Sequence, residues 1–228
     1  MKNKERRKEE VEVRIEEILL SGTLNVPSDA GGIVLFAHGS GSSRLSPRNQ
    51  FVAQVLQRNG SGTLLFDLLT PEEEEEDERT AALRFDIEFL AQRLCSATRW
   101  LQDYLGEHRP ALGYFGSSTG GGAALVAAAR EGSEIAAVVS RGGRPDLAGA
   151  ALARVRSPTL LIVGGADHFV LRLNREALHE LRCEKELAVV PGATHLFEEP
   201  GTLEEVARLA ADWFRRHWSQ NHPSLSQS

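Results

Sequence analysis

Short, uninterrupted apolar runs recur along most of this chain, and segments of helical pattern separate them. Such a run is typical of a strand that is buried on both faces of a sheet. Strands that alternate with helices in this way favour an α/β fold with a mostly parallel sheet and helices on both faces. The expected strands are 32–37, 63–66, 111–115, 135–139, 159–163 and 186–190. The expected helices are 47–59, 84–105, 119–131, 171–182 and 202–218.

The first part of the chain has a different pattern. Residues 11–15 alternate between apolar and polar side chains, which predicts a half-buried strand. Residues 19–26 predict a second strand that stops at Pro27, so we expect the two strands to form an antiparallel hairpin. We expect one domain over residues 11–218, a disordered lead-in over 1–10 and a disordered tail over 219–228.

The composition limits the classes of function. The 228 residues carry a formal net charge of −6, and no basic face dense enough for nucleic acid is evident. The chain lacks a signal-peptide pattern and any apolar segment of about 18 residues, so we expect a cytoplasmic, soluble protein without a membrane partner. Cys95 and Cys183 have no partner at metal-ligand spacing and suggest a reducing compartment. We expect no metal and no cofactor, in a monomer or a homodimer.

Residues 116–120 read G-x-S-x-G, with Ser118 at the centre. The expected strand 111–115 precedes this stretch and the expected helix 119–131 follows it. A serine at such a strand-to-helix turn is held in a strained backbone with its hydroxyl exposed. Small residues on either side let the strand and helix pack closely. We therefore predict that Ser118 is a nucleophile; the alternative is a structural turn, which Gly-Ser pairs also mark.

A nucleophilic serine needs a base within hydrogen-bond reach and a carboxylate that orients the base. At this kind of turn the partners follow in the order serine, acid, histidine. Asp167 follows the strand 159–163 across small residues, whereas Asp146 lies one loop earlier, where helix capping suits it. We favour Asp167 as the acid. His195 lies in a loop of small residues after the last strand, and we predict that it is the base.

The oxyanion that forms during acyl transfer needs at least two hydrogen-bond donors. The N–H of Thr119, at the start of the helix after Ser118, is one candidate. The loop after strand 32–37 supplies the other, with the N–H of Ser40 as first choice and that of Gly41 as second. His38, in the same loop, is expected to be a structural hydrogen-bonding residue.

Segments 38–43, 116–120 and 192–197 together resemble the α/β-hydrolase superfamily, and within it the dienelactone-hydrolase-like group of small esterases. Residues 117–120 and 194–198 look most like bacterial members that are often fused to, or encoded beside, phosphoribosyltransferases. The resemblance implies an α/β-hydrolase fold with an N-terminal antiparallel hairpin and no large cap domain. Dienelactone hydrolases proper use a cysteine nucleophile, so the serine at position 118 favours general ester hydrolysis instead.

These observations predict a serine carboxylesterase that acts on a small-molecule ester through Ser118, Asp167 and His195. One alternative is a thioesterase or an acyltransferase that uses the same three residues. The other is a binding module that has kept the fold and lost the chemistry.

Other polar residues near the expected site have open roles. Arg44, Arg141 and Arg144 each either bind a substrate carboxylate or pair with a local carboxylate, and Gly41 is a further candidate substrate contact. The acidic run 72–78 is predicted to be a solvated loop or an exposed helical turn. Its place near the sheet edge suggests that it discourages anionic substrates. Finally, Thr202 and Glu205 have the spacing of a helix capping box.

Overall fold

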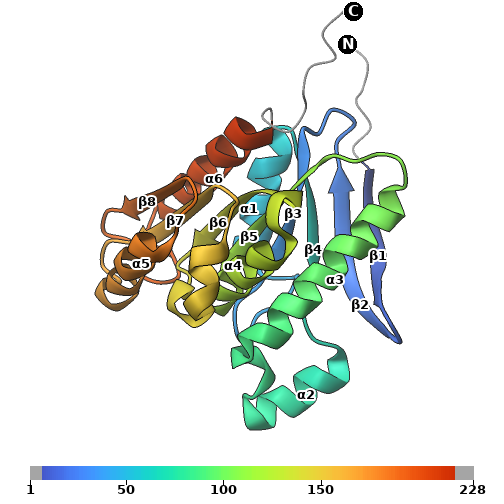
Figure 1. Cartoon of the computed structure of the whole chain (residues 1–228), viewed down its shortest axis with the longest axis horizontal. Coiled ribbons are helices and arrows are strands. Elements are labelled where there is room, and N and C mark those ends of the chain that lie inside the picture. Colours follow the sequence, from blue (N-terminus) through green and yellow to red (C-terminus); the bar gives the residue numbers. More distant parts are fainter. Residues whose placement is uncertain (1–6, 219–228) are drawn as a thin grey trace, which may run out of the picture.

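An eight-stranded sheet runs through the part of the chain that the computed structural model describes, residues 7–218 (Figure 1). β1 (Arg7–Ile15) pairs antiparallel with β2 (Ile18–Val26), and β2 pairs antiparallel with β4 (Ser61–Phe66). The other neighbours are parallel, in the order β4-β3-β5-β6-β7-β8. These strands are β3 (Gly32–Ala37), β5 (Ala111–Ser117), β6 (Ile135–Arg141), β7 (Thr159–Gly164) and β8 (Lys185–Val190). The predicted parallel sheet and N-terminal hairpin are confirmed.

Helices cover both faces of this sheet (Figure 1). On one face lie α1 (Pro47–Arg58) and α6 (Thr202–Trp218), which also pack against each other. On the other face lie α3 (Ile87–Leu105), α4 (Thr119–Glu131) and α5 (His168–Glu180). Each central strand therefore separates two apolar cores.

The residues of β3 show why the central strands are apolar throughout. Val34 and Phe36 pack into the core beneath α1 and α6, whereas Ile33 and Leu35 pack into the core beneath α3 and α4. Because side chains alternate across a strand, a strand buried on both faces needs an apolar residue at every position.

The chain between β4 and α3 differs from the prediction. The acidic run belongs to a helix, α2 (Pro71–Thr80), which lies below the sheet in the view of Figure 1. A short 3₁₀ turn, η1 (Leu83–Phe85), follows it. Helix α3 begins at Ile87 rather than at residue 84, because the side chain of Asp86 accepts a hydrogen bond from the Phe89 N–H at 2.9 Å and caps the helix.

Smaller differences occur elsewhere. A 3₁₀ segment that was not expected, η3 (Pro145–Arg154), connects β6 to β7, and a shorter one, η2 (Gly132–Glu134), follows α4. The first strand begins at Arg7, so the predicted lead-in over 1–10 is too long. Residues 1–6 and the predicted tail over 219–228 lie outside the described residues.

The predicted capping box at the last helix is wrong. Thr202 is already the first residue of α6, and its hydroxyl donates to the Glu199 carbonyl at 2.7 Å. The Glu205 N–H bonds the Gly201 carbonyl at 3.1 Å, as an ordinary helical bond. The hydroxyl of Thr202 thus caps nothing in its own helix.

The parallel strands all point the same way, so the loops that leave their carboxyl ends gather at one edge of the sheet. In open α/β sheets this edge is where ligands bind. Within residues 7–218, no helix is both long enough and apolar enough to cross a bilayer.

Candidate active site

Ser118 lies at the sharp turn between β5 and α4. Its backbone has φ 53° and ψ −121°, which is a strained conformation for a residue with a side chain. Three backbone bonds hold it there. The Ser118 N–H donates to the Arg141 carbonyl at 3.3 Å, and the Ser118 carbonyl accepts from the N–H groups of Gly121 and Arg144, both at 3.0 Å. This is the backbone state that the G-x-S-x-G pattern predicts for an exposed nucleophile.

The two flanking glycines are needed because backbone passes directly over them. A Cβ on Gly116 would lie 2.7 Å from the Cα of Gly121. A Cβ on Gly120 would lie 2.6 Å from the carbonyl oxygen of His38 and still closer to that of Ala37. Real Cβ atoms do not approach backbone so closely. The close packing of strand and helix predicted for this turn is confirmed.

Asp167 and His195 are brought together from the ends of two neighbouring strands, β7 and β8. His195 Nδ1 lies 2.7 Å from Asp167 Oδ2. The other carboxylate oxygen accepts from the Val170 N–H at 3.3 Å, which caps α5 and fixes the Asp167 side chain. Because a carboxylate oxygen accepts, Nδ1 carries the proton and donates it, and Nε2 is left able to accept one.

The His195 ring lies against the loop that holds Ser118. A Cβ on Gly142 would lie 3.2 Å from the His195 carbonyl oxygen and 3.6 Å from the ring carbon Cε1. Gly142 directly follows Arg141, whose carbonyl accepts the Ser118 N–H. The histidine loop is itself fastened by Thr194, whose N–H and hydroxyl donate to Glu199 at 3.1 and 2.6 Å.

Asp146, the alternative acid, is engaged elsewhere. Both of its carboxylate oxygens accept hydrogen bonds from Arg144, at 2.8 and 2.7 Å. It does not cap the η3 segment either, because the capping position there is Arg144 and no side chain makes a capping hydrogen bond. The expected capping role of Asp146 is therefore wrong.

The loop after β3 lies directly on the Ser118 elbow, which is the sharp turn between β5 and α4. A Cβ on Gly39 would lie 3.0 Å from the Cβ of Ser118. His38 is 8 % exposed, and its Nε2 accepts from the Leu68 N–H at 3.0 Å while Nδ1 donates to the Gly39 carbonyl at 3.1 Å. Burial lowers the pKa of His38 and keeps the ring neutral. The structural role predicted for His38 is confirmed.

Ser40, Gly41 and Thr119, the candidate oxyanion residues, line one pocket of about 220 Å³. Leu68, Leu69 and Leu90 form its apolar wall, and three acidic side chains of α2 reach it from the other side. Gly41 has a φ of 64°, which favours glycine at that turn.

The three candidate arginines have different surroundings. Arg44 pairs with Asp67 at 2.9 Å, and Arg144 pairs with Asp146, so both meet a local carboxylate.

Arg141 is 6 % exposed and meets no carboxylate among the described residues. Its Nη2 donates to the Asn49 side chain at 3.3 Å. Its guanidinium carbon lies 5.8 Å from the centre of the Phe197 ring. Burial and the charge of Arg48 lower the pKa of Arg141 to about 10.

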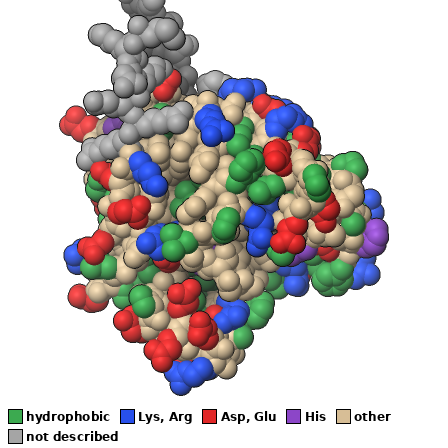
Figure 2. Space-filling model, turned by 180° about the vertical axis from the view of Figure 1, so that it is seen from behind, with side chains coloured by type: hydrophobic (Ala, Val, Ile, Leu, Met, Phe, Trp, Pro, Cys, Tyr) green, Lys and Arg blue, Asp and Glu red, His purple; other side chains and the backbone are tan. Residues whose placement is uncertain are grey.

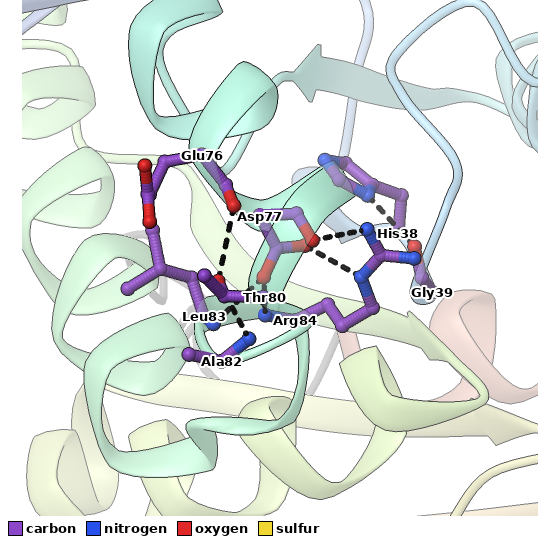
Figure 3. A network of polar contacts seen from close by, with 8 residues as sticks. All are labelled: His38, Gly39, Glu76, Asp77, Thr80, Ala82, Leu83 and Arg84. Atoms are coloured by element: carbon purple, nitrogen blue, oxygen red, sulfur yellow. Dashed lines mark hydrogen bonds and ion pairs between the residues drawn. The ribbon is translucent and has the colours of Figure 1, made fainter.

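Sequence reasoning missed an ion pair at the pocket wall (Figure 3). Asp77 is 2 % exposed, and its carboxylate accepts from the N–H groups of Leu83 and Arg84 at 2.7 and 3.0 Å. The Arg84 side chain donates to it at 2.6 Å. The available signal was that Asp77 is the one aspartate in a run of glutamates. The described residues contain no cluster of acidic, histidine or cysteine side chains suited to a metal ion.

Comparisons with known proteins match one family model and several solved structures. The model of the dienelactone hydrolase family matches residues 48–220. The crystal structure of a dienelactone hydrolase from Anabaena variabilis is 57 % identical, with a TM-score of 0.91, and covers 93 % of this chain and 98 % of that chain. The structure of Est1E from Butyrivibrio proteoclasticus has a TM-score of 0.73 at 15 % identity, covering 92 % of this chain and 99 % of that chain.

Curated relatives from two strains of Mycobacterium tuberculosis are longer than this chain. Each is 57 % identical over 218 residues, which make up 96 % of this chain and 48 % of the relative. Both are provisionally named phosphoribosyl transferases. The chain thus spans about half the length of the curated relatives it matches.

Proposed function

Because the chain belongs to the dienelactone hydrolase family, we propose that it is a serine hydrolase that cleaves small carboxylic esters. Its fold is the α/β-hydrolase fold, as the sequence predicts. The observation that carries the proposal is the strained Ser118 elbow together with the 2.7 Å contact between His195 and Asp167. A nucleophile, a base and an orienting acid are the minimum set for acyl transfer through a covalent intermediate.

In the proposed reaction, His195 Nε2 removes the hydroxyl proton of Ser118, and the serine oxygen attacks the ester carbonyl. Asp167 stabilises the imidazolium that forms. The N–H groups of Thr119 and Ser40 donate to the oxyanion, and the proton on His195 passes to the departing alcohol. Water then attacks the acyl-enzyme with His195 again as base, which releases the acid and restores Ser118.

The substrate contacts are part of the same proposal. Gly41 lines the pocket beside Ser40, which supports a contact with the substrate. The ion pairs of Arg44 and Arg144 support local pairing instead of carboxylate binding for those two residues. We assign Arg141 a positioning role, because its carbonyl holds Ser118 and its side chain packs beside Phe197, two residues after His195.

The name of the mycobacterial relatives does not alter this proposal. A dienelactone hydrolase covers almost all of this chain at 57 % identity, so the shared half carries the hydrolase fold. We propose that the transferase name refers to the half of those relatives that this chain does not match.

Replacing Ser118 with alanine tests the proposal. We expect kcat for a short p-nitrophenyl ester to fall about 10⁶-fold, because serine hydrolases lose that much with their nucleophile. Ser117→Ala, which removes the neighbouring hydroxyl, is the control and should keep most of the activity. Undiminished activity in Ser118→Ala would refute the assignment.

Two further measurements separate the alternatives. A thioesterase would turn over a matched thioester much faster than the oxygen ester, and an acyltransferase would pass the acyl group to an added alcohol. A binding module without chemistry would leave Ser118 unlabelled by a fluorophosphonate probe in the folded protein.

A further inference from the structure

The pocket beside the proposed oxyanion donors has two chemically different walls. Leu68, Leu69 and Leu90 supply an apolar wall, and Glu74, Asp77 and Glu78 of α2 supply an acidic one. Residues 74, 77 and 78 share one face of the helix, because positions three and four apart lie above one another. Figure 2 shows acidic side chains gathered on the lobe that α2 forms.

The charges on this wall are only partly compensated. Arg84 also lines the pocket, where its charge neutralises the buried Asp77. Glu74 and Glu78 are exposed and make no ion pair among the described residues. Partial desolvation of its carboxyl group raises the pKa of Glu74, and the neighbouring charges of Asp67, Glu78 and Asp77 raise it further. Negative charge is therefore crowded at this side of the pocket.

Thr119 gives an independent sign that the pocket receives a ligand. It lines the pocket and is 3 % exposed, and its Oγ1 is buried with no hydrogen-bond partner among the described residues. Buried hydroxyl groups in native proteins nearly always have a partner. A group bound in the pocket would supply one, directly beside the N–H that we assign to the oxyanion.

We propose that this pocket holds the acyl chain of the substrate and selects chains that end in a positively charged amine over chains that end in a carboxylate. The proposal rests on the function proposed above. The carbonyl lies between Ser40 and Thr119, the methylene groups follow Leu68, Leu69 and Leu90, and the ammonium faces Glu74 and Glu78. Glu74 and Glu78 are thus the specificity-determining residues.

Three p-nitrophenyl esters of similar length test this: the 6-aminohexanoate, the hexanoate and the monoester of adipate. We expect kcat/KM for the amino ester to exceed that for the adipate monoester at least about tenfold, because two carboxylates attract one chain end and repel the other. The double variant Glu74→Gln, Glu78→Gln should bring this ratio close to one. Glu75→Gln removes the same charge from another face of α2 and should leave the ratio as in the wild type.

Replacing Thr119 with valine tests the hydroxyl without changing the shape of the side chain. We expect kcat/KM to fall about threefold to tenfold for all three esters, as for the loss of one hydrogen bond. An unchanged kcat/KM for all three esters would show that Thr119 Oγ1 makes no hydrogen bond to the substrate.

A wild-type ratio near one, or a preference for adipate, would overturn the inference while leaving the esterase proposal intact. If no ester is hydrolysed, the proposed function fails by itself. Calorimetric binding of 6-aminohexanoate and adipate to the wild type then decides the inference separately: tighter binding of the amine supports it, and equal or weaker binding refutes it.

Discussion

Ser118 is held in place by backbone groups of its neighbours, not by their side chains. Its positive φ is kept by three backbone hydrogen bonds, and the α4 backbone at Gly120 touches the carbonyl groups at the end of β3. Strain at one residue persists only where the surroundings over-determine it. The elbow is thus a property of the contact between strands and helix.

Gly120→Ala should therefore destabilise the protein by about 3 kcal/mol, because its methyl group would meet immovable backbone. Gly132→Ala, at the other end of α4, is the matched control. Gly132 has a φ of 62° and a ψ of −121° with open space around it, so backbone strain of about 1–3 kcal/mol without a steric clash is expected there. Urea unfolding measures both variants, and equal losses would contradict the steric explanation.

His38 makes the folded protein sensitive to acid. Its Nε2 accepts the Leu68 N–H only while the ring is neutral, and burial lowers its pKa below the usual value. The unfolded chain therefore takes up the proton first, and stability falls as the pH drops below about 6.5. His38→Leu should be about 1–3 kcal/mol less stable at pH 7.5, because the Leu68 N–H loses its acceptor.

The difference between wild type and His38→Leu should shrink between pH 6.5 and pH 5, since only the wild type loses this contribution. Unfolding curves at both pH values measure it. His217, whose pKa is also lowered, is present in both proteins and cancels in the comparison. A difference that stays constant with pH would contradict the assignment.

At this scale the sequence predicted the residues whose place follows from strand ends. Ser118, Asp167 and His195 each lie at or shortly after the end of a recognisable apolar strand, and the structure brings Asp167 and His195 into contact. Their catalytic roles stay predictions. It failed for Asp146 and Thr202, where a short polar residue near a helix start has several competing partners. The sequence does not reveal that Asp146 accepts a hydrogen bond from Arg144, or that the Thr202 hydroxyl donates to the Glu199 carbonyl.

Helix α2 is longer and more firmly anchored than the solvated loop or exposed helical turn that the sequence predicted. Consecutive glutamates repel, yet the helix forms because its ends are fastened. Thr70 and Glu73 make a capping box at 3.2 and 2.9 Å, and Glu73 also meets Arg93 at 2.5 Å. The acidic side chains of the first turn suit the positive end of the helix dipole. The Thr-Pro-Glu-Glu start was visible in the sequence, but the partners Arg84 and Arg93 were not.

Asp77→Ala should release the far end of α2. It removes the acceptor of two backbone N–H groups and leaves Arg84 without its partner, so we expect a loss of about 3–5 kcal/mol. Thermal and urea unfolding measure the loss, and Glu75→Gln on the same helix should be nearly neutral. A small effect for both would show that Asp77 does not anchor the helix.

Across the whole molecule, the last helix, α6, packs against the first residues of β3 and β4. Trp218 of α6 packs against Gly31 and Gly32, and its ring N–H donates to the Ser61 hydroxyl at 3.0 Å. This contact could not be predicted, because α6 and β3 are far apart in sequence. What could be predicted was that a helix with a strongly apolar stripe ends the fold.

Trp218→Ala should cost about 3–5 kcal/mol, because a buried indole leaves a large cavity. Trp100 on α3 is the matched control, since it is only half-buried and stacks on Tyr104. Urea unfolding followed by circular dichroism compares the two variants. Equal losses of stability would show that the Trp218 contact does not hold α6 against β3 and β4.

The two outer strands bear on how the protein behaves in crowded solution. β1 presents Lys8, Glu10, Glu12 and Arg14 on its exposed face, and β8 begins with the exposed Lys185 and Glu186. An unpaired strand edge invites another chain to add a strand, and charges along it keep the edge hydrated. The charges on both edge strands therefore oppose fibrous self-assembly, and concentrated solutions of the protein should remain free of aggregates.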